Sequence, residues 1–379
     1  MSSVPATDAK APKARLHIDH LEERAVPAVT ADFFQVGGFL QVQGDAGNND
    51  LFVQADAAGN LQVLADGEQV DINVISVPGF GDPAAPTTAN TNNIQISGNL
   101  GNDRLSVDAS VGTINLTLDG GAGNDVLDLF NGSFGAAYQG NSVMIGGAGN
   151  DQLISGRGND AMFGGDGNDL LRWDPGTIND FMEGGRGRDT VQVIGNDTFL
   201  SDDPSPDTFQ LSANGERVRF DRLNLIPFTL DIGTVENIVL QPGDGDDTVL
   251  IKDLTGVKSL RTVTVEGGQG NDVIDASEQA NARIRLRLDG GEGDDTITGG
   301  AGRDVIRGGD GNDTLDGGDG RDQVRGDAGD DTIDGGDDNQ QDRLIGGAGA
   351  DTYVVHAAQK ADAFRGFNPA TGDEIEEVL

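Results

Sequence analysis

Cysteine is absent from this sequence, and aromatic residues make up only 5% of its 379 positions. The first absence excludes a disulfide framework and any thiolate metal site. The second makes a large conventional core unexpected, since aromatic side chains supply much of the buried area in such cores. No stretch reaches the roughly 18 apolar residues of a membrane-spanning helix. Residues 1–30 also lack the apolar centre of a secretory signal peptide.

Positive charge is scarce as well. Lysine and arginine number 25 against 64 aspartates and glutamates, which gives a formal net charge of −39. So acidic a field argues against nucleic-acid or anionic-membrane partners. The acidic residues recur at fixed spacing beside glycine, which accounts for 59 residues. That spacing indicates metal ligands rather than solubilising charge, with divalent cations as the natural counter-ions.

Repeats of nine residues occupy two blocks. The longer block runs from 290 to 354 and reads GGEGDDTIT, GGAGRDVIR, GGDGNDTLD, GGDGRDQVR, GDAGDDTID, GGDDNQQDRLI and GGAGADTYV. The other opens at 146 with GGAGNDQLI, SGRGNDAMF and GGDGNDLLR, passes through RWDPGTINDFME and closes with GGRGRDTVQ. Single copies read GNLGNDRLS, GGAGNDVLD, PGDGDDTVL and GGQGNDVID. A fixed period of this kind predicts a stacked repeat architecture.

One aspartate in each repeat keeps the register. In the longer block five are nine residues apart and two more follow a two-residue insertion: Asp295, Asp304, Asp313, Asp322 and Asp331, then Asp342 and Asp351. The other block has the same arrangement in Asp151, Asp160 and Asp169, then Asp180 and Asp189. Two nonapeptides would make one turn of a coil. Aspartates 18 apart would then stack on one edge of it, and the intervening ones on the other.

The repeat pattern is G-G-x-G-x-D-x-U-x, where U is aliphatic. Glycine permits the positive φ angles of a tight turn, which would aim several carbonyl oxygens at one place beside the carboxylate. An all-oxygen site of roughly six ligands suits Ca²⁺, whereas Mg²⁺ demands a tighter octahedron and transition metals favour His or Cys. The single U side chain of a repeat buries too little area to offset the entropy of ordering nine residues. The ladders are therefore predicted to fold only with calcium.

This pattern resembles the hemolysin-type, or RTX, calcium-binding repeat family. The resemblance implies an all-β fold, a right-handed parallel β-helix or β-roll solenoid of glycine- and aspartate-rich nonapeptides, with several Ca²⁺ ions between successive turns. It implies carboxylate ligands at Asp151, Asp160, Asp169, Asp180, Asp189, Asp295, Asp304, Asp313, Asp322, Asp331, Asp342 and Asp351. The loop backbone would contribute at Gly147, Gly149, Gly165, Gly167, Gly291, Gly293, Gly300, Gly302, Gly309, Gly311, Gly318 and Gly320. Ser155 and Asp327 replace glycines, so their turns depart from the pattern.

The remaining segments alternate apolar and polar residues with a β-type composition. Residues 31–145 and 196–266 are predicted to be wider, irregular β-helix rungs, with Asn214-Gly215 as a hairpin turn. An irregular β-sandwich between two ladders is the alternative. The predicted divisions are a disordered basic leader (1–30), a first ladder (146–195), a second ladder (267–355) and a C-terminal cap (356–379). Phe364, Phe367 and Ile375 would close the cap.

The three histidines are His17, His20 and His356, and their small number argues against a histidine-based catalytic site. Trp173 beside Arg172 is interpreted as a packing residue. We expect a calcium-binding protein, not an enzyme, of structural or adhesive type, located outside the cell or at its surface. Its expected partners are calcium ions, with a cell-surface or matrix polysaccharide or protein as candidates. The alternative is a carbohydrate-active enzyme, or a carbohydrate-binding adhesin, that uses the β-helix face.

Overall fold

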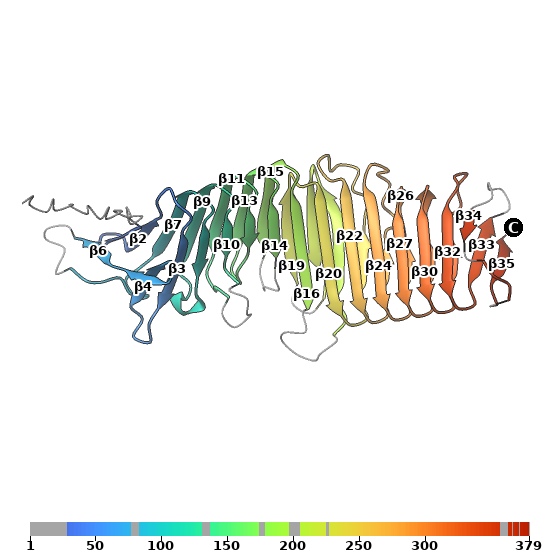
Figure 1. The fold of residues 1–379 in the computed structure, drawn as a ribbon, viewed down its shortest axis with the longest axis horizontal. Coiled ribbons are helices and arrows are strands. Elements are labelled where there is room, and N and C mark those ends of the chain that lie inside the picture. Colours follow the sequence, from blue (N-terminus) through green and yellow to red (C-terminus); the bar gives the residue numbers. More distant parts are fainter. Residues whose placement is uncertain are drawn as a thin grey trace, which may run out of the picture.

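A computed structural model describes residues 29–76, 83–130, 137–173, 179–196, 205–224, 227–356, 363–365, 367–370 and 372–378. This part of the chain coils into a long rod of about 12 turns (Figure 1). Each turn contributes a strand to each of two large sheets, which we call sheet A and sheet B. The only helical element described is the 3-10 turn η1 (Ala109–Val111), and no described helix has the length and apolar character needed to cross a membrane.

Sheet A has 18 strands. Their bounds are β1 (Thr30–Phe34), β2 (Phe39–Gln43), β6 (Ile72–Ile75), β7 (Asn93–Leu100), β9 (Asn115–Ala122), β11 (Ser142–Ala148), β13 (Asp160–Gly167), β15 (Asp180–Gly187), β17 (Thr208–Asn214), β18 (Arg217–Arg222), β19 (Phe228–Gly233), β21 (Thr248–Ile251), β23 (Val273–Asp275), β25 (Thr296–Thr298), β28 (Thr314–Asp316), β31 (Thr332–Asp334), β33 (Thr352–His356) and β35 (Glu374–Val378).

Sheet B has 15 strands. They are β3 (Asp50–Ala55), β4 (Leu61–Ala65), β5 (Glu68–Val70), β8 (Arg104–Val107), β10 (Val126–Asp128), β12 (Gln152–Ile154), β14 (Leu170–Trp173), β16 (Thr190–Asn196), β20 (Asn237–Asp244), β22 (Thr262–Gln269), β24 (Arg285–Glu292), β27 (Val305–Asp310), β30 (Gln323–Ala328), β32 (Arg343–Ala348) and β34 (Ala363–Arg365). A small pair, β26 (Ala301–Gly302) and β29 (Asp319–Gly320), lies at one edge.

Almost all neighbouring strands run parallel, as in a solenoid. The antiparallel pairs are β1–β2, β3–β4, β4–β5, β17–β18 and β18–β19. The all-β parallel solenoid predicted from the repeats is therefore confirmed. The Asn214-Gly215 hairpin is confirmed too, because Asn214 pairs with Arg217 across the β17–β18 turn and Gly215 has a φ of +69°. The predicted domain boundaries stay predictions, and residues 1–28 of the predicted leader lie outside the described residues.

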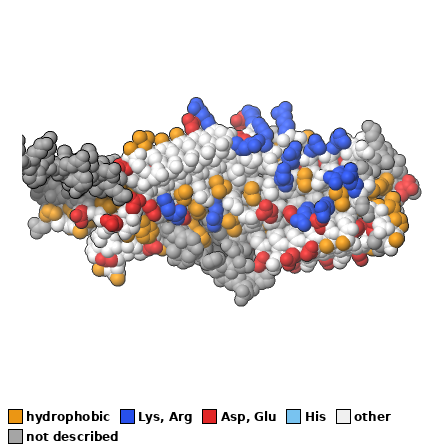
Figure 2. All heavy atoms as spheres, in the orientation of Figure 1, with side chains coloured by type: hydrophobic (Ala, Val, Ile, Leu, Met, Phe, Trp, Pro, Cys, Tyr) orange, Lys and Arg blue, Asp and Glu red, His pale blue; other side chains and the backbone are white. Residues whose placement is uncertain are grey.

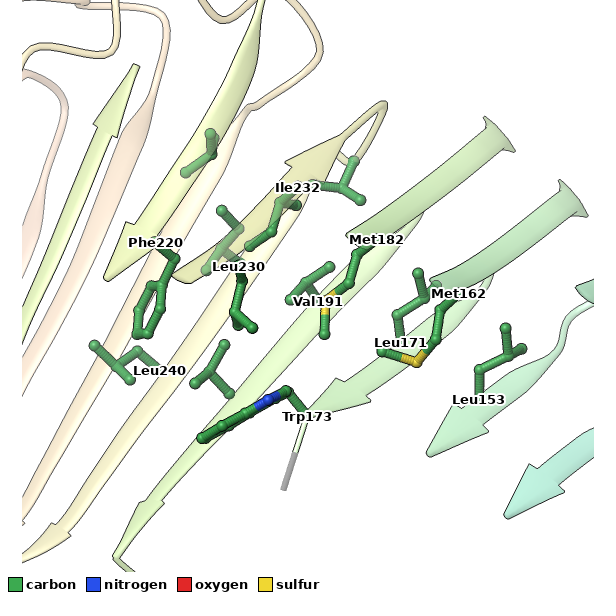
Figure 3. Packing of buried hydrophobic residues seen from close by; sticks show 14 of the residues in the cluster. Leu153, Met162, Leu171, Trp173, Met182, Val191, Phe220, Leu230, Ile232 and Leu240 are labelled. Carbon is green, nitrogen blue, oxygen red and sulfur yellow. The ribbon is translucent and has the colours of Figure 1, made fainter. Parts of the chain in front are cut away.

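The core is a continuous column of apolar side chains between the two sheets. The predicted U residues point into it, since Ile297, Ile306, Leu315, Val324 and Ile333 are all buried. Their neighbours in sequence are more exposed, as expected when successive side chains of a strand point to opposite faces. Trp173 lies buried in this column (Figure 3), and its ring stacks on that of Phe228 with centroids 4.1 Å apart. Its role as a packing residue is confirmed.

The C-terminal end continues the coil. β35 pairs in parallel with β33, and β34 with β32, so the chain adds part of a further turn. Phe364 packs against the core, and both Phe364 and Phe367 make edge-on contacts with the ring of Tyr353. Ile375 remains 49% exposed. Of the three side chains proposed to close the rod, the two aromatic ones therefore reach Tyr353, at the end of the core.

Candidate metal-binding turns

The two sheets meet at two edges of the rod. At one edge the chain passes from a sheet A strand to a sheet B strand, and we call it the A-to-B edge. At the other it returns, and we call that the B-to-A edge. The glycine-rich turns with their aspartates form these edges. Each aspartate stands directly before the strand that follows its turn or, at Asp160 and Asp180, is the first residue of that strand.

An upstream ladder of aspartates follows the A-to-B edge. It consists of Asp103, Asp125, Asp151, Asp169 and Asp189. In each step the backbone N–H of one aspartate donates to Oδ1 of the aspartate one turn further on, at 2.8–2.9 Å. The ladder ends where the N–H of Asp189 donates to Glu236 at 2.8 Å.

A downstream ladder of the same construction follows the opposite, B-to-A edge. It consists of Asp247, Asp272, Asp295, Asp313, Asp331 and Asp351. Its N–H to Oδ1 distances are 2.7–3.2 Å. The long ladder thus changes edge between Asp189 and Asp247. The antiparallel strands β17 and β18 lie in that interval, between β19 and β21 in sheet A.

Each edge also carries one short ladder. Asp160 and Asp180 stack on the B-to-A edge, and Asp304, Asp322 and Asp342 on the A-to-B edge. The predicted stacking is therefore present, with alternate aspartates on opposite edges. The pairs 20 residues apart, such as Asp322 and Asp342, keep the same hydrogen bond (2.7 Å) as the pairs 18 apart. The insertions change the turns but leave the ladder continuous.

The residue before the aspartate forms a second ladder that runs the opposite way. The N–H of Asn168 donates to Oδ1 of Asn150, and that of Asn312 to Oδ1 of Asp294, one turn back along the chain. The full sets of acceptors are Asn48, Asn102, Asn124, Asn150 and Asn168 upstream, and Asp246, Asn271, Asp294, Asn312 and Asp330 downstream. Each turn is thereby tied to both of its neighbours.

Oδ1 of each ladder aspartate is used in this way, but Oδ2 is not. In the downstream ladder this second oxygen is buried without a hydrogen-bond partner in Asp247, Asp272, Asp295, Asp313 and Asp331. The same holds for the five upstream ladder aspartates and for Asp322. A buried carboxylate oxygen without a donor is costly, so it requires a cation or a proton. A cation between two turns fits this arrangement.

Two short-ladder residues are different. Oδ2 of Asp160 accepts the N–H of Gly156 at 3.0 Å, and Oδ2 of Asp304 that of Gly300 at 3.4 Å. These turns therefore offer fewer free carboxylate oxygens than the long ladders. No group of three or more His, Cys, Asp or Glu residues converges on one point in the described part of the chain. Any metal site must combine two stacked carboxylates with turn carbonyls.

The glycines make room for these oxygens. A Cβ on Gly290 would lie 2.0 Å from Oδ2 of Asp295, and one on Gly309 would lie 2.0 Å from the carbonyl oxygen of Gly291. Of the twelve predicted loop glycines, all except Gly300 have positive φ. The turn thus holds carboxylate and carbonyl oxygens with no side-chain carbon between them. This space and the orphaned oxygens fit the oxygen ligands that Ca²⁺ prefers.

Burial also changes the acidity of these groups. It raises the pKa of Asp151 to about 7, and the charges of Asp125 and Asp169 add to the rise. Burial, then the charges of Asp304, Asp342 and Asp338, raise the pKa of Asp322 to about 8. Ladder hydrogen bonds from backbone N–H groups act in the opposite direction. Without a cation these two carboxyl groups therefore keep their protons to a higher pH than a free aspartate does, and a bound cation must displace them.

The structure places all twelve predicted aspartates in the ladders, each at most 4% exposed. Whether each one ligates calcium stays a prediction. Sequence reasoning left Asp103, Asp125, Asp247 and Asp272 out of the ligand set, although they continue the same ladders. The turns of Asp103, Asp125 and Asp272 carry the same G-x-x-G-x-D signal, and that of Asp247 differs only in Pro242 at the first glycine, but all four lie 22 to 26 residues from the next aspartate instead of 18.

Comparison with known families agrees with this geometry. The model of the RTX calcium-binding nonapeptide repeat (four copies) matches residues 117–133, 137–171, 176–192, 264–281, 289–324, 307–339 and 316–353. The resemblance drawn from the sequence is thereby confirmed, and with it the binding of several calcium ions at the repeats. A search among curated proteins finds no match.

Proposed function

Starting from the RTX calcium-binding repeats that this chain carries, we propose that calcium folds it into a non-enzymatic rod that serves a structural or adhesive role outside the cell or at its surface. The observation that supports this most directly is the row of buried, unpaired Oδ2 atoms along each long ladder. Burying them without a cation destabilises the folded chain. Calcium removes that penalty and adds binding free energy to folding.

The ligands we propose are the twelve predicted aspartates together with carbonyl oxygens of their turns. We expect the tightest sites between uninterrupted neighbours of the long ladders, namely Asp151 with Asp169, Asp295 with Asp313, and Asp313 with Asp331. Each of these carboxylates has an Oδ2 atom free. Asp304 and Asp322 are also 18 residues apart, but we expect their site to bind calcium more weakly than the other three, because Oδ2 of Asp304 already accepts an N–H.

The location follows from affinity. Extracellular calcium modules commonly have dissociation constants of about 10⁻⁴–10⁻³ M. Cytosolic calcium is far below that range, so sites of this strength would stay empty inside the cell and the ladders would not fold there. Folding on arrival in a calcium-rich medium would keep the chain extended until it is outside.

Isothermal titration with CaCl₂, combined with a count of bound ions, tests the proposal. We expect several ions per chain and a parallel gain of β-structure in circular dichroism at millimolar calcium. Equal β-content in chelator and in calcium would contradict calcium-dependent folding. MgCl₂ at the same concentration is the control, and it should bind fewer ions and induce less structure.

A matched pair of variants tests the ligand assignment. Asp313→Asn keeps an Oδ1 that can accept the N–H of Asp295 but removes the charge that serves the turns on both sides. Asp310→Asn removes one charge from an exposed position three residues earlier in the same turn. At a calcium concentration near the dissociation constant of the parent sites, we expect the first variant to bind fewer ions than the parent chain and the second to bind the same number. Identical ion counts for the two variants would exclude Asp313 as a ligand.

A further inference from the structure

Arginine is concentrated on one face of this acidic rod. The outer side of sheet B in the C-terminal half carries exposed arginines on five adjacent strands or within two residues before them. They are Arg285, Arg287, Arg303, Arg307, Arg321, Arg325, Arg343 and Arg365. Figure 2 shows Lys and Arg side chains gathered over this half of the rod, above a line of acidic side chains at its lower edge. We call these eight residues the arginine face.

Part of the arginine face is neutralised within the protein. Arg307 pairs with Asp289 and Asp327, and Arg325 also pairs with Asp327. Arg285, Arg287 and Arg303 make no ion pair with any residue that the structure describes. Arg321 and Arg343 donate to neutral acceptors, the carbonyl oxygen of Gln341 at 3.5 Å and Oε1 of Gln323 at 3.1 Å.

Of the arginines without an ion pair, all but Arg287 border a groove at the A-to-B edge. The groove has a volume of 420 Å³, and Arg285, Arg303, Arg321, Arg343 and Arg365 line it together with the short ladder beneath. A second hollow of 410 Å³ shares Arg285 and Arg303 with it and extends along the same edge. One arginine comes from each of five consecutive rungs, so the row spans roughly 19 Å at about 4.8 Å per rung.

We propose that this groove binds a linear acidic polysaccharide, with the arginine row contacting carboxylate or sulfate groups of successive sugars. The spacing between successive turns of the rod is close to the length of one sugar unit. The charges of the polysaccharide and those of the arginine row therefore recur at similar intervals. Guanidinium groups form paired hydrogen bonds with such planar or tetrahedral anions, which explains the absence of lysine from the described part of the row. The inference rests on the proposed extracellular role and supplies a ligand for it.

Two other polyanions fit less well. A nucleic-acid duplex carries one charge per roughly 1.7 Å along its axis, and its width would bring the strongly acidic B-to-A edge and N-terminal half within its field. A second copy of this chain offers a matching row of carboxylates, but it also carries the same net charge of −39. A single narrow chain can occupy the groove without either conflict.

Titration of the full chain in millimolar calcium tests the proposal, with hexagalacturonate as carboxylate probe, a heparin hexasaccharide as sulfate probe and maltohexaose as neutral control. We expect binding of at least one acidic probe, weaker at high salt, and none of maltohexaose. The double substitution R303Q/R321Q should lower affinity by roughly tenfold or more. R303K/R321K should lose less, because it keeps the charge but not the planar fork.

The matched control is R307Q/R325Q, which removes the same charge from the same face but from arginines already paired with aspartate. It should change affinity by less than about twofold. Equal losses in R303Q/R321Q and R307Q/R325Q would overturn the proposal. So would binding of a dT hexamer with the same affinity and the same arginine dependence, or a dimer in sedimentation that R303Q/R321Q dissociates.

Calcium titrations of each variant by circular dichroism separate this inference from the proposed function. Normal calcium-induced folding with no probe binding would overturn the polysaccharide groove and leave calcium folding intact. If R303Q/R321Q shifts the calcium midpoint of folding, a second double substitution, R285Q/R343Q, replaces it in the test, because these two side chains lie on strands rather than in turns. The proposal then requires that R285Q/R343Q lose roughly tenfold in probe affinity while its calcium midpoint is unchanged.

Discussion

Two stretches of the rod with the same coil differ in how much apolar surface they bury. In the middle, the turn formed by β20 and β21 buries Ile238, Leu240, Val249 and Ile251. In the C-terminal ladder, the turn formed by β27 and β28 buries only Ile306 and Leu315. Fully burying an aliphatic side chain contributes about 1.5–3 kcal/mol, so a middle turn has about twice the hydrophobic stabilisation of a ladder turn.

The comparison teaches how one architecture can be held together in two ways. The middle turns have longer strands and two apolar side chains on each side. An aromatic cluster of Trp173, Phe220 and Phe228 lies beside them, and Figure 3 shows the first two of these together with Leu240 of β20. The C-terminal ladder has short strands in sheet A and carboxylates stacked at every turn. Its cohesion must come from what neutralises those carboxylates. The two regions should therefore respond very differently to calcium.

Calcium withdrawal should produce the largest difference. Amides of β25, β27, β28 and β30 should lose protection from hydrogen exchange, by about 2.7 kcal/mol for each site that had been saturated at 100 times its dissociation constant. Amides of β20 and β21 should change much less, since buried side chains hold that region. Hydrogen exchange read by mass spectrometry, with and without chelator, measures both. Equal loss in both regions would show that the rod unfolds as one unit.

The second largest difference between the two regions should be their response to pH in calcium-free solution. Burial, and then neighbouring carboxylates, raise the pKa of Asp295 and of Asp331 to about 7. A carboxyl whose pKa is raised on folding stabilises the folded state below its unfolded value near 4, and this stabilisation is lost as pH rises through the folded value. Calcium-free ladder amides should thus be better protected near pH 4 than near pH 8. If protection of the ladder amides increased with pH in calcium-free buffer, the predicted effect of the raised pKa values would be contradicted.

With calcium present the same carboxylates should show the opposite trend. Protons and calcium compete for them, so apparent calcium affinity should fall as pH drops below about 7. Circular dichroism titrations at several pH values measure this directly. A calcium midpoint independent of pH between 5 and 8 would mean that the ladder carboxylates are not the ligands.

Replacing a glycine by alanine tests how tightly a turn of the ladder is packed, compared with the β17–β18 hairpin. Gly309 has a φ of +129°, and a Cβ there would lie 2.0 Å from the carbonyl oxygen of Gly291. Gly309→Ala should cost more than about 2 kcal/mol, because backbone must move as well as adopt a strained angle. Gly215 in the β17–β18 hairpin has a φ of +69° and open space around it, so Gly215→Ala should cost only about 1–2 kcal/mol. Thermal unfolding in saturating calcium compares the two.

Single carboxylates should give the smallest effect. Asp313→Asn should lower calcium affinity roughly tenfold, or about 1.4 kcal/mol, by removing one ligand charge. Asp247→Asn should have less effect, because Pro242 stands where its repeat would begin with glycine. Calorimetric titration of both variants compares the narrow turns, whose aspartates are 18 residues apart, with the wide turns, whose aspartates are 22 to 26 residues apart. A larger loss in Asp247→Asn would make the wide turns the principal sites.

Much of the ladder could be predicted from sequence because its register is local. Residues 18 apart, such as Asp295 and Asp313, stack since two nonapeptides complete one turn, and the inward position of Leu315 follows from strand alternation. The ladder membership of Asp272 could not be predicted in this way. Its partners lie 25 residues back at Asp247 and 23 forward at Asp295. Only the paired strands show that the extra residues are accommodated at the opposite edge.

By itself, then, the sequence determined the nine-residue register, the aspartate at each turn and the alternation of neighbouring repeats between two edges. Short-range spacing and backbone geometry suffice for all three. Tertiary structure alone decided that the long ladder moves from the A-to-B edge to the B-to-A edge between Asp189 and Asp247. That change depends on how β17, β18 and β19 pair between β15 and β21. It also decided that arginines from five rungs form one groove, because contacts between residues so far apart in the chain leave no periodic signal that identifies their partners.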